Sequence, residues 1–307
     1  MSAPHPEITI VGASLAGLTL ALACVARGVP VHVVERSAGH VHGGDSLSID
    51  LALVAAATGH DPRQPPVLPV VPAYRELTTW PALYAWLRER AIATPGIVLE
   101  EGKTVASITD LGDRARITFA DGSERVAAAV IGADGYRSTV RRAIAPEAPF
   151  ARYAGYLVWR GLVEERTLAR PVPWPSDGGL WIEFMGGYRL VAATLPGRDG
   201  SVEPGRRQVT FAWFDVHRDE LLRRSGCLTA DGEKGSPPSF ATARPSSADW
   251  LNWRRKKRRQ CKGTGTTRSA SAISSAPARI IQFAIQGARS VRSWYFSPCT
   301  IWRATPE

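Results

Sequence analysis

A glycine-containing turn near the N-terminus has the composition of a phosphate-binding site. The six residues Gly12-Ala-Ser-Leu-Ala-Gly17 follow an apolar run, and Ser14 stands where the strict Gly-x-Gly-x-x-Gly fingerprint has its middle glycine. Gly12 permits a tight turn, Gly17 permits a helix to pack closely on a strand, and the helix N-terminus offers free N–H groups to a pyrophosphate. Glu35, 23 positions beyond Gly12, could accept hydrogen bonds from the hydroxyl groups of a ribose. This spacing favours a dinucleotide-binding site.

A strand, a helix and a second strand must bring these residues together. Residues 7–11 form a short β-branched run, and apolar residues then recur at spacings of three and four along residues 15–25, which indicates a helix. Gly28 can adopt a left-handed conformation and ends this helix, and residues 30–34 form a second strand that leads to Glu35. This order predicts a Rossmann-type βαβ unit in an α/β fold. The alternative is a βαβ unit whose turn contains glycine for structural reasons alone.

A second glycine-flanked acid lies further along the chain. Residues 130–141 run from an apolar strand through Asp134 and Gly135 into a helix start, with the sequence Val-Ile-Gly-Ala-Asp-Gly-Tyr-Arg-Ser-Thr-Val-Arg. An aspartate in this position could meet the ribityl and pyrophosphate part of a long cofactor. With these two motifs, the chain resembles the group A FAD-dependent monooxygenases, which are aromatic hydroxylases. Residues 14–18, 78–84 and 155–165 resemble most the 2,6-dihydroxypyridine hydroxylase branch of that family.

The resemblance implies which residues bind the cofactor. They are Gly12, Ser14, Leu15, Ala16, Gly17, Glu35, Arg36, Val105, Asp134, Gly135 and Arg137. Asp134 and Gly135 match a motif that serves both FAD and NAD(P)H. Arg137 falls where the family places a cation near the reduced nicotinamide cofactor, and Val105 matches a position whose backbone meets the adenine.

The family chemistry implies an enzyme that uses FAD, with NADH or NADPH as co-substrate, to transfer one oxygen atom of O2 to an electron-rich aromatic or heteroaromatic ring. The catalytic residues are not assigned. His217, Tyr153, Tyr156 and Tyr188 are candidates for a general base by residue type alone. The alternative function is a non-catalytic or truncated flavoprotein homologue that binds nucleotide weakly.

Residues 1–150 are expected to form the FAD-binding domain. The pattern within it predicts a helix at residues 78–91 and strands at residues 98–99, 105–108, 115–119 and 126–131, with a hairpin turn at Asp121-Gly122. Strands close to the two motifs would complete the sheet on which the cofactor site is built.

Residues 151–233 are expected to form a partial, β-rich substrate domain. Apolar and polar residues alternate in residues 155–165, 180–194 and 206–215, which is typical of half-buried antiparallel strands. In the family such strands roof the substrate pocket. The tryptophans of these strands, Trp159, Trp181 and Trp213, also suit an ordinary sheet core.

The resemblance covers residues 5–233, and one family motif is missing beyond the first domain. The family carries a second Gly-Asp motif, where a helix N-terminus meets the flavin. This chain contains no Gly-Asp dipeptide after residue 150. The flavin end of the predicted site therefore lacks the residues that the family would supply there.

Residues 234–307 differ abruptly in composition and are expected to form a basic, disordered tail. They hold 14 of the 38 Lys and Arg residues and two of the 28 acids, which leaves 24 bases and 26 acids in residues 1–233. Ten of these 74 residues are Leu, Ile, Val or Phe, a low share that is typical of disorder. Three interpretations stay open: out-of-frame translation, a solvated linker, and a nucleic-acid-binding arm around the six cations at 254–259. The abruptness favours the first.

Composition also argues against several classes of protein. No run of about 18 apolar residues is present, so a membrane-spanning helix is not expected, and the first residues do not resemble a secretory signal. The four cysteines are far apart, which fits a reducing cytoplasm, and His40 and His42 lack further ligands for a metal. We expect a cytoplasmic protein without bound metal, whose partners are a small aromatic substrate and O2 and not membrane or nucleic acid; a homodimer is left open.

Overall fold

The structure is a computed structural model in which the chain forms two compact units. The described residues are 8–39, 46–61, 68–71, 76–149, 152–168, 179–185, 188–216, 219–224, 226–229 and 297–303. The first unit comprises residues 1–152, 199–202 and 302–307, and the second comprises residues 153–198 and 203–301. Among the described residues, no helix is long and apolar enough to cross a membrane.

The first unit is built on a four-stranded parallel sheet. In spatial order its strands are β5 (Ile97–Glu101), β2 (Val31–Glu35), β1 (Ile8–Val11) and β9 (Ala129–Gly132). Val11 at the end of β1 lies between Val34 of β2 and Gly132 of β9, so the three strands end at one edge. The turns that follow β1 and β9 therefore meet at this edge, beside Glu35.

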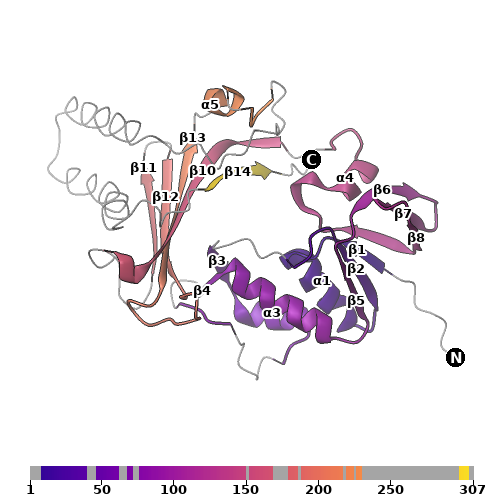
Figure 1. Cartoon of the computed structure of the whole chain (residues 1–307), viewed down its shortest axis with the longest axis horizontal. Coiled ribbons are helices and arrows are strands. Elements are labelled where there is room, and N and C mark those ends of the chain that lie inside the picture. Colours follow the sequence, from indigo (N-terminus) through magenta and orange to yellow (C-terminus); the bar gives the residue numbers. More distant parts are fainter. Residues whose placement is uncertain are drawn as a thin grey trace. The chain divides into compact units, whose positions relative to one another are not determined.

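Helices cover one face of this sheet (Figure 1). The helix α1 (Leu15–Val25) follows β1, and α3 (Trp80–Ala93) lies beside it, so both helices predicted from the sequence are confirmed. Sheet and helices share one buried core, which includes Ile10, Val33, Leu18, Leu22 and Leu87. Gly28, three residues beyond α1, has a φ of 77°, as its predicted left-handed conformation requires.

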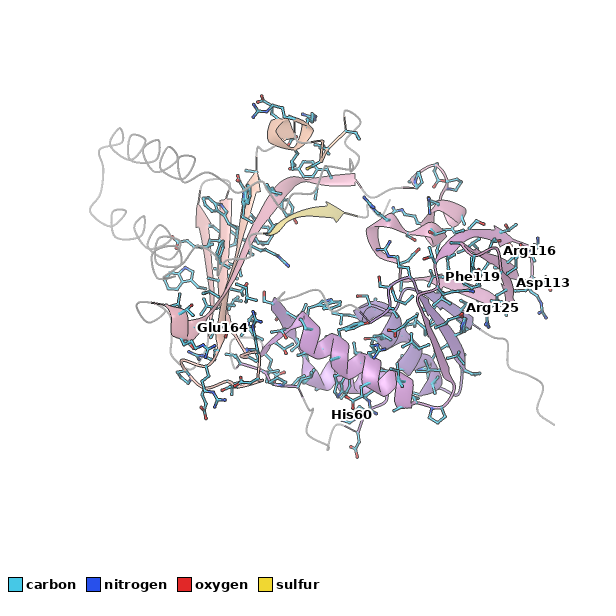
Figure 2. The ribbon with its side chains drawn as sticks, in the orientation of Figure 1. His60, Asp113, Arg116, Phe119, Arg125 and Glu164 are labelled. Carbon is cyan, nitrogen blue, oxygen red and sulfur yellow. The ribbon has the colours of Figure 1, made fainter. Side chains whose placement is uncertain are left out.

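A three-stranded antiparallel sheet covers the other face. Its strands are β6 (Val105–Asp110), β7 (Ala115–Phe119) and β8 (Glu124–Ala127). Val11 and Val34 point away from the helices, because successive residues of a strand face opposite sides, and they pack with Phe119 of β7. The hairpin turn predicted between β7 and β8 is confirmed, with Gly122 at a φ of 83°. Figure 2 shows Phe119 on this sheet, which also carries Arg116 and Arg125.

The single strand predicted over residues 126–131 is wrong. The structure has two strands there, β8 and β9, which are separated by Ala128 and belong to different sheets. β8 pairs antiparallel with β7, whereas β9 pairs parallel with β1. The apolar run continues without a break because both strands are partly buried, so its pattern carries no sign of the change of sheet.

Short elements complete the first unit. They are the antiparallel pair β3 (Ser46–Ile49) and β4 (Glu76–Thr79), and the helices α2 (Leu51–Thr58) and α4 (Thr139–Ile144). A 3-10 turn at Gly135–Arg137 leads from the end of β9 into α4. It places the second glycine-flanked acid at the same edge of the parallel sheet as Gly12.

The second unit contains a five-stranded sheet. In spatial order its strands are β11 (Leu180–Met185), β12 (Tyr188–Leu195), β13 (Gln208–Val216), β10 (Arg152–Glu164) and β14 (Ser297–Arg303), and a short helix, α5 (Asp219–Arg224), follows β13. The pairs from β11 to β10 are antiparallel, so the alternation found in the sequence is confirmed as strand structure. Trp213 is 6% exposed in the sheet core. β14 lies within the basic segment 234–307, whose other residues are outside the described part of the chain.

Candidate cofactor site

A cavity of about 350 Å³ opens at the edge where β1, β2 and β9 end. Its wall contains eight of the residues expected to bind the cofactor: Gly12, Ser14, Glu35, Arg36, Val105, Asp134, Gly135 and Arg137. The other three, Leu15, Ala16 and Gly17, lie in the first turn of α1 and do not line it. All of these residues belong to the first unit.

Gly12 and Gly17 are positions where a side chain would not fit. Gly12 has a φ of 103°, and a Cβ atom placed on it would lie 2.5 Å from the carbonyl oxygen of Ala133. A Cβ atom on Gly17 would collide with the carbonyl oxygen of Gly12. The turn after β1 can therefore approach the turn after β9 because Gly12 has no side chain, and α1 can pack against the turn after β1 because Gly17 has none. The backbone of Gly12 is left bare in the cavity wall.

The start of α1 can accept an anion. Ser14 is the N-cap residue, and its side chain forms no capping hydrogen bond. The first backbone N–H groups of a helix have no partner within the helix, and the helix dipole places partial positive charge there. Leu15, Ala16 and Gly17 do not line the cavity, and their backbone N–H groups at the start of α1 are the groups that could meet an anion.

Glu35 is held at the end of β2 by two backbone groups. The Ala13 N–H donates to Oε2 at 2.8 Å, and the Ser37 N–H donates to Oε1 at 2.9 Å. Each carboxylate oxygen keeps a second acceptor direction. The side chain is therefore fixed in place and can still accept hydrogen bonds from a ribose.

Asp134 mainly positions the chain around it. Its Oδ1 accepts a hydrogen bond from the Ser138 hydroxyl at 2.6 Å, and its Oδ2 accepts from the N–H groups of Thr139 at 2.6 Å and Val140 at 3.3 Å. These contacts join the turn after β9 to the start of α4. Gly135, with a φ of 74°, allows that turn, and Arg137 lies exposed at its end.

The wall also contains ten residues that were not expected from the sequence, among them Lys103, Trp80 and Tyr84. Lys103 donates to Asp121 Oδ2 at 2.6 Å and to Ser123 Oγ at 2.9 Å, and its Nζ lies 4.7 Å from the centre of the Phe119 ring. Trp80 and Tyr84 come from the first turns of α3. Lys103 stands two positions before Val105, which was a usable signal, whereas the two aromatic residues read as core positions of a helix.

Comparisons with known proteins show which proteins this chain is similar to. A family described as FAD binding domain-like matches residues 153–263. The chain is 28% identical over 238 residues to 2,6-dihydroxypyridine 3-monooxygenase of Paenarthrobacter nicotinovorans, and 33% identical over 242 residues to 3-amino-4-hydroxybenzoate 2-monooxygenase of Streptomyces cremeus. The chain is therefore similar in sequence to monooxygenases of aromatic and heteroaromatic compounds, and part of it matches an FAD-binding family.

These matches cover 70% of this chain in both cases, and 56% and 58% of the two relatives, so the chain spans little more than half their length. The solved structure of 2,6-dihydroxypyridine-3-hydroxylase from Arthrobacter nicotinovorans is similar in fold, with a TM-score of 0.59, 21% identity, and coverage of 83% of this chain and 67% of that one. The match to the FAD binding domain-like family extends to residue 263, and the predicted change at Glu233 stays a prediction.

The structure describes some of the residues that were considered as a general base or as metal ligands, and leaves others out. Burial, and then the charge of Asp219 and a hydrogen bond to it, raise the pKa of Tyr153 to about 12, so this phenol is protonated at neutral pH and is a poor general base. Tyr156 packs against Phe214 at 5.6 Å between ring centres. His40, His42 and His217 lie outside the described residues, as does the side chain of Tyr188. Among the described residues, no cluster of three metal-ligating side chains occurs.

Proposed function

We propose that this chain is an FAD-dependent monooxygenase that hydroxylates an electron-rich aromatic or heteroaromatic compound with NAD(P)H and O2. The observation that carries the proposal is the meeting of Gly12, Glu35 and Asp134 at one cavity, at the edge where three parallel strands end. In the balanced reaction, substrate, NAD(P)H, a proton and O2 give the hydroxylated product, NAD(P)+ and water. Bound FAD would supply the redox chemistry.

The described residues fit the nucleotide half of such a cofactor. The bare backbone at Gly12 and the N–H groups at the start of α1 suit the pyrophosphate, and the fixed carboxylate of Glu35 suits the ribose. The cations Arg36, Lys103 and Arg137 line the same cavity and favour an anionic ligand. Val105 lines this cavity, and the resemblance puts the adenine beside it.

We propose further that residues 1–150 bind FAD, that residues 151–233 carry the aromatic substrate, and that the protein works in the cytoplasm. The relatives act on dihydroxypyridine, aminohydroxybenzoate and urate, as their names state, which supports an electron-rich ring as substrate class. The use of NADH or NADPH as co-substrate remains a prediction, and so does a homodimer.

A second candidate function is a homologue that binds nucleotide weakly and does not turn over. One observation favours it: the chain has no Gly-Asp dipeptide after residue 150. In this alternative the cavity of the first unit still binds a nucleotide, and the hydroxylation does not take place.

A visible absorption spectrum separates the two candidates. The purified chain is incubated with excess FAD, desalted and measured between 350 and 500 nm, in about the range where flavin absorbs. Flavin retained at about one equivalent, followed by oxidation of NAD(P)H that depends on a phenol or hydroxypyridine, supports the monooxygenase. Weak flavin binding without oxidation of NAD(P)H in the presence of these substrates supports the non-catalytic homologue.

A further inference from the structure

Two aromatic side chains on α3 form a stacked pair in the cavity wall. Trp80 and Tyr84 are four residues apart and so lie on the same side of the helix. Their rings are nearly parallel, with an angle of 9° and a distance of 4.9 Å between centres. Both residues line the cavity that also contains Glu35. The stacking holds the Tyr84 ring in one orientation.

The hydroxyl group of Tyr84 has no partner among the described residues. The residue is 5% exposed, yet it lines the cavity, and its hydroxyl makes no hydrogen bond within the described part of the chain. Among the described residues, its oxygen is not one of the fully buried side-chain atoms that lack a partner, so it is accessible from the cavity. A ligand in the cavity would satisfy this hydroxyl.

Two charged side chains near Tyr84, Arg88 and Glu101, form an ion pair with each other. Arg88 donates to Glu101 through Nε at 2.8 Å and through Nη2 at 2.6 Å. Burial and the charges of Glu101 and Glu35 raise the pKa of Tyr84, against the opposite effect of Arg88. The phenol therefore stays protonated at neutral pH and remains a hydrogen-bond donor beside two carboxylates.

The start of α3 offers few backbone donors that could replace this hydroxyl. Pro81 has no N–H group, and the Ala82 N–H donates to the Thr79 hydroxyl at 3.3 Å. The polar group that α3 presents to the cavity is therefore carried by a side chain. Glu35 accepts hydrogen bonds, and Tyr84 can donate one.

We propose that Tyr84 is a further binding residue, which donates its hydroxyl hydrogen to an oxygen of the ribose that Glu35 holds, and that Trp80 positions Tyr84 by stacking. A ribose hydroxyl both donates and accepts, so it complements a carboxylate and a phenol at once. This inference rests on the proposed function, because it assigns Tyr84 to the nucleotide half of the same cofactor.

The test compares Tyr84→Phe with wild type and with Tyr156→Phe, which removes a hydroxyl from the second unit. Affinities for FAD and for ADP, which carries the same ribose, are measured by fluorescence titration or equilibrium dialysis, and thermal unfolding checks that each variant folds. Tyr84→Phe keeps the stacked ring and is expected to weaken both ligands by about two- to tenfold, as the loss of one hydrogen bond predicts. Tyr156 packs against Phe214, so Tyr156→Phe should bind ADP as wild type does.

A second variant keeps the test valid if Tyr84→Phe folds poorly. Trp80→Leu removes the stacked ring, keeps the Tyr84 hydroxyl, and is expected to weaken FAD and ADP as well. Wild-type affinity in both Tyr84→Phe and Trp80→Leu, with binding lost in Gly12→Ala, overturns the role of Tyr84 and leaves the proposed function standing. If wild type binds ADP and not FAD, and Tyr84→Phe weakens ADP, the proposed function fails and the role of Tyr84 stands. If wild type binds neither, both are overturned.

Discussion

The N–H group of Ala13 donates a hydrogen bond to Oε2 of Glu35 at 2.8 Å, across 22 positions of sequence. This contact ties the turn after β1 to the end of β2, the two places where a dinucleotide would lie. Because Ser37 holds the other carboxylate oxygen, Glu35 is oriented before any ligand arrives. Such fixed orientation lowers the entropic cost of binding.

Replacing Gly12 by Ala should abolish FAD binding. The φ of 103° is strained for alanine, and its Cβ atom would lie 2.5 Å from the Ala133 oxygen, so the two turns must separate. The strain alone costs about 1–3 kcal/mol. Gly28→Ala is the matched control, since Gly28 also has a positive φ and has open space around it. Flavin retention after desalting measures the effect, and retention in Gly12→Ala equal to that in Gly28→Ala contradicts the prediction.

Replacing Glu35 by Gln should weaken FAD binding by about tenfold, because hydrogen bonds to a charged acceptor are stronger than those to a neutral amide. The N–H groups of Ala13 and Ser37 each donate to one oxygen of the carboxylate. In the glutamine variant one of these oxygens is replaced by an amide nitrogen, which cannot accept a hydrogen bond. Titration of flavin fluorescence gives the dissociation constant. Glu89→Gln, an exposed acid on α3, controls for the change in net charge. Equal affinities of the two variants would argue against a role of Glu35 in binding.

Asp134→Asn should lower the free energy of unfolding by about 1 kcal/mol, which is typical for the loss of one hydrogen bond. Only one oxygen remains to accept hydrogen bonds, so either the Ser138 hydroxyl or the Thr139 and Val140 N–H groups lose their acceptor. Urea unfolding measures the change. Asp113→Asn is the control, since Asp113 is exposed in the turn between β6 and β7, where Figure 2 labels it. A loss of the same size in both variants would show that Asp134 does not hold the turn.

The second unit should lose stability in acid through Glu165. Burial acts to raise the pKa of this carboxyl, but hydrogen bonds from the Arg207 guanidinium and the Gly205 N–H outweigh burial and lower the pKa. Because the folded-state pKa is below the unfolded value of about 4.3, the group stabilises the fold above that pH, and this contribution is lost as the pH falls further.

Glu165→Gln should therefore flatten the dependence of unfolding free energy on pH between about 5 and 3. At pH 7 it should cost about 3 kcal/mol, because it leaves the 2% exposed Arg207 without its carboxylate. Glu203→Gln removes an ion pair to Arg206 in which Glu203 is 72% exposed, so its effect should stay below about 1 kcal/mol. Urea unfolding at several pH values measures both variants. An unchanged acid profile in Glu165→Gln would contradict the role of this pair.

The sequence predicted the local fold around the cavity. Gly12, Gly17 and Glu35 belong to one strand–helix–strand unit, whose periodicity and turn residues fix how far apart these residues lie. Asp134 and Gly135 form a local turn of the same kind, at the end of a second apolar strand. Short connections leave such units little choice of geometry.

The rest of the cavity was decided by the tertiary structure. Trp80 and Tyr84 have the spacing of helix core residues, and no local pattern shows that α3 presents them beside Glu35. The apolar run 126–131 likewise hides the change of sheet between β8 and β9, because burial on either sheet selects the same residue types. Local sequence determined which turns can hold a phosphate, and the packing of distant strands and helices determined which side chains surround them.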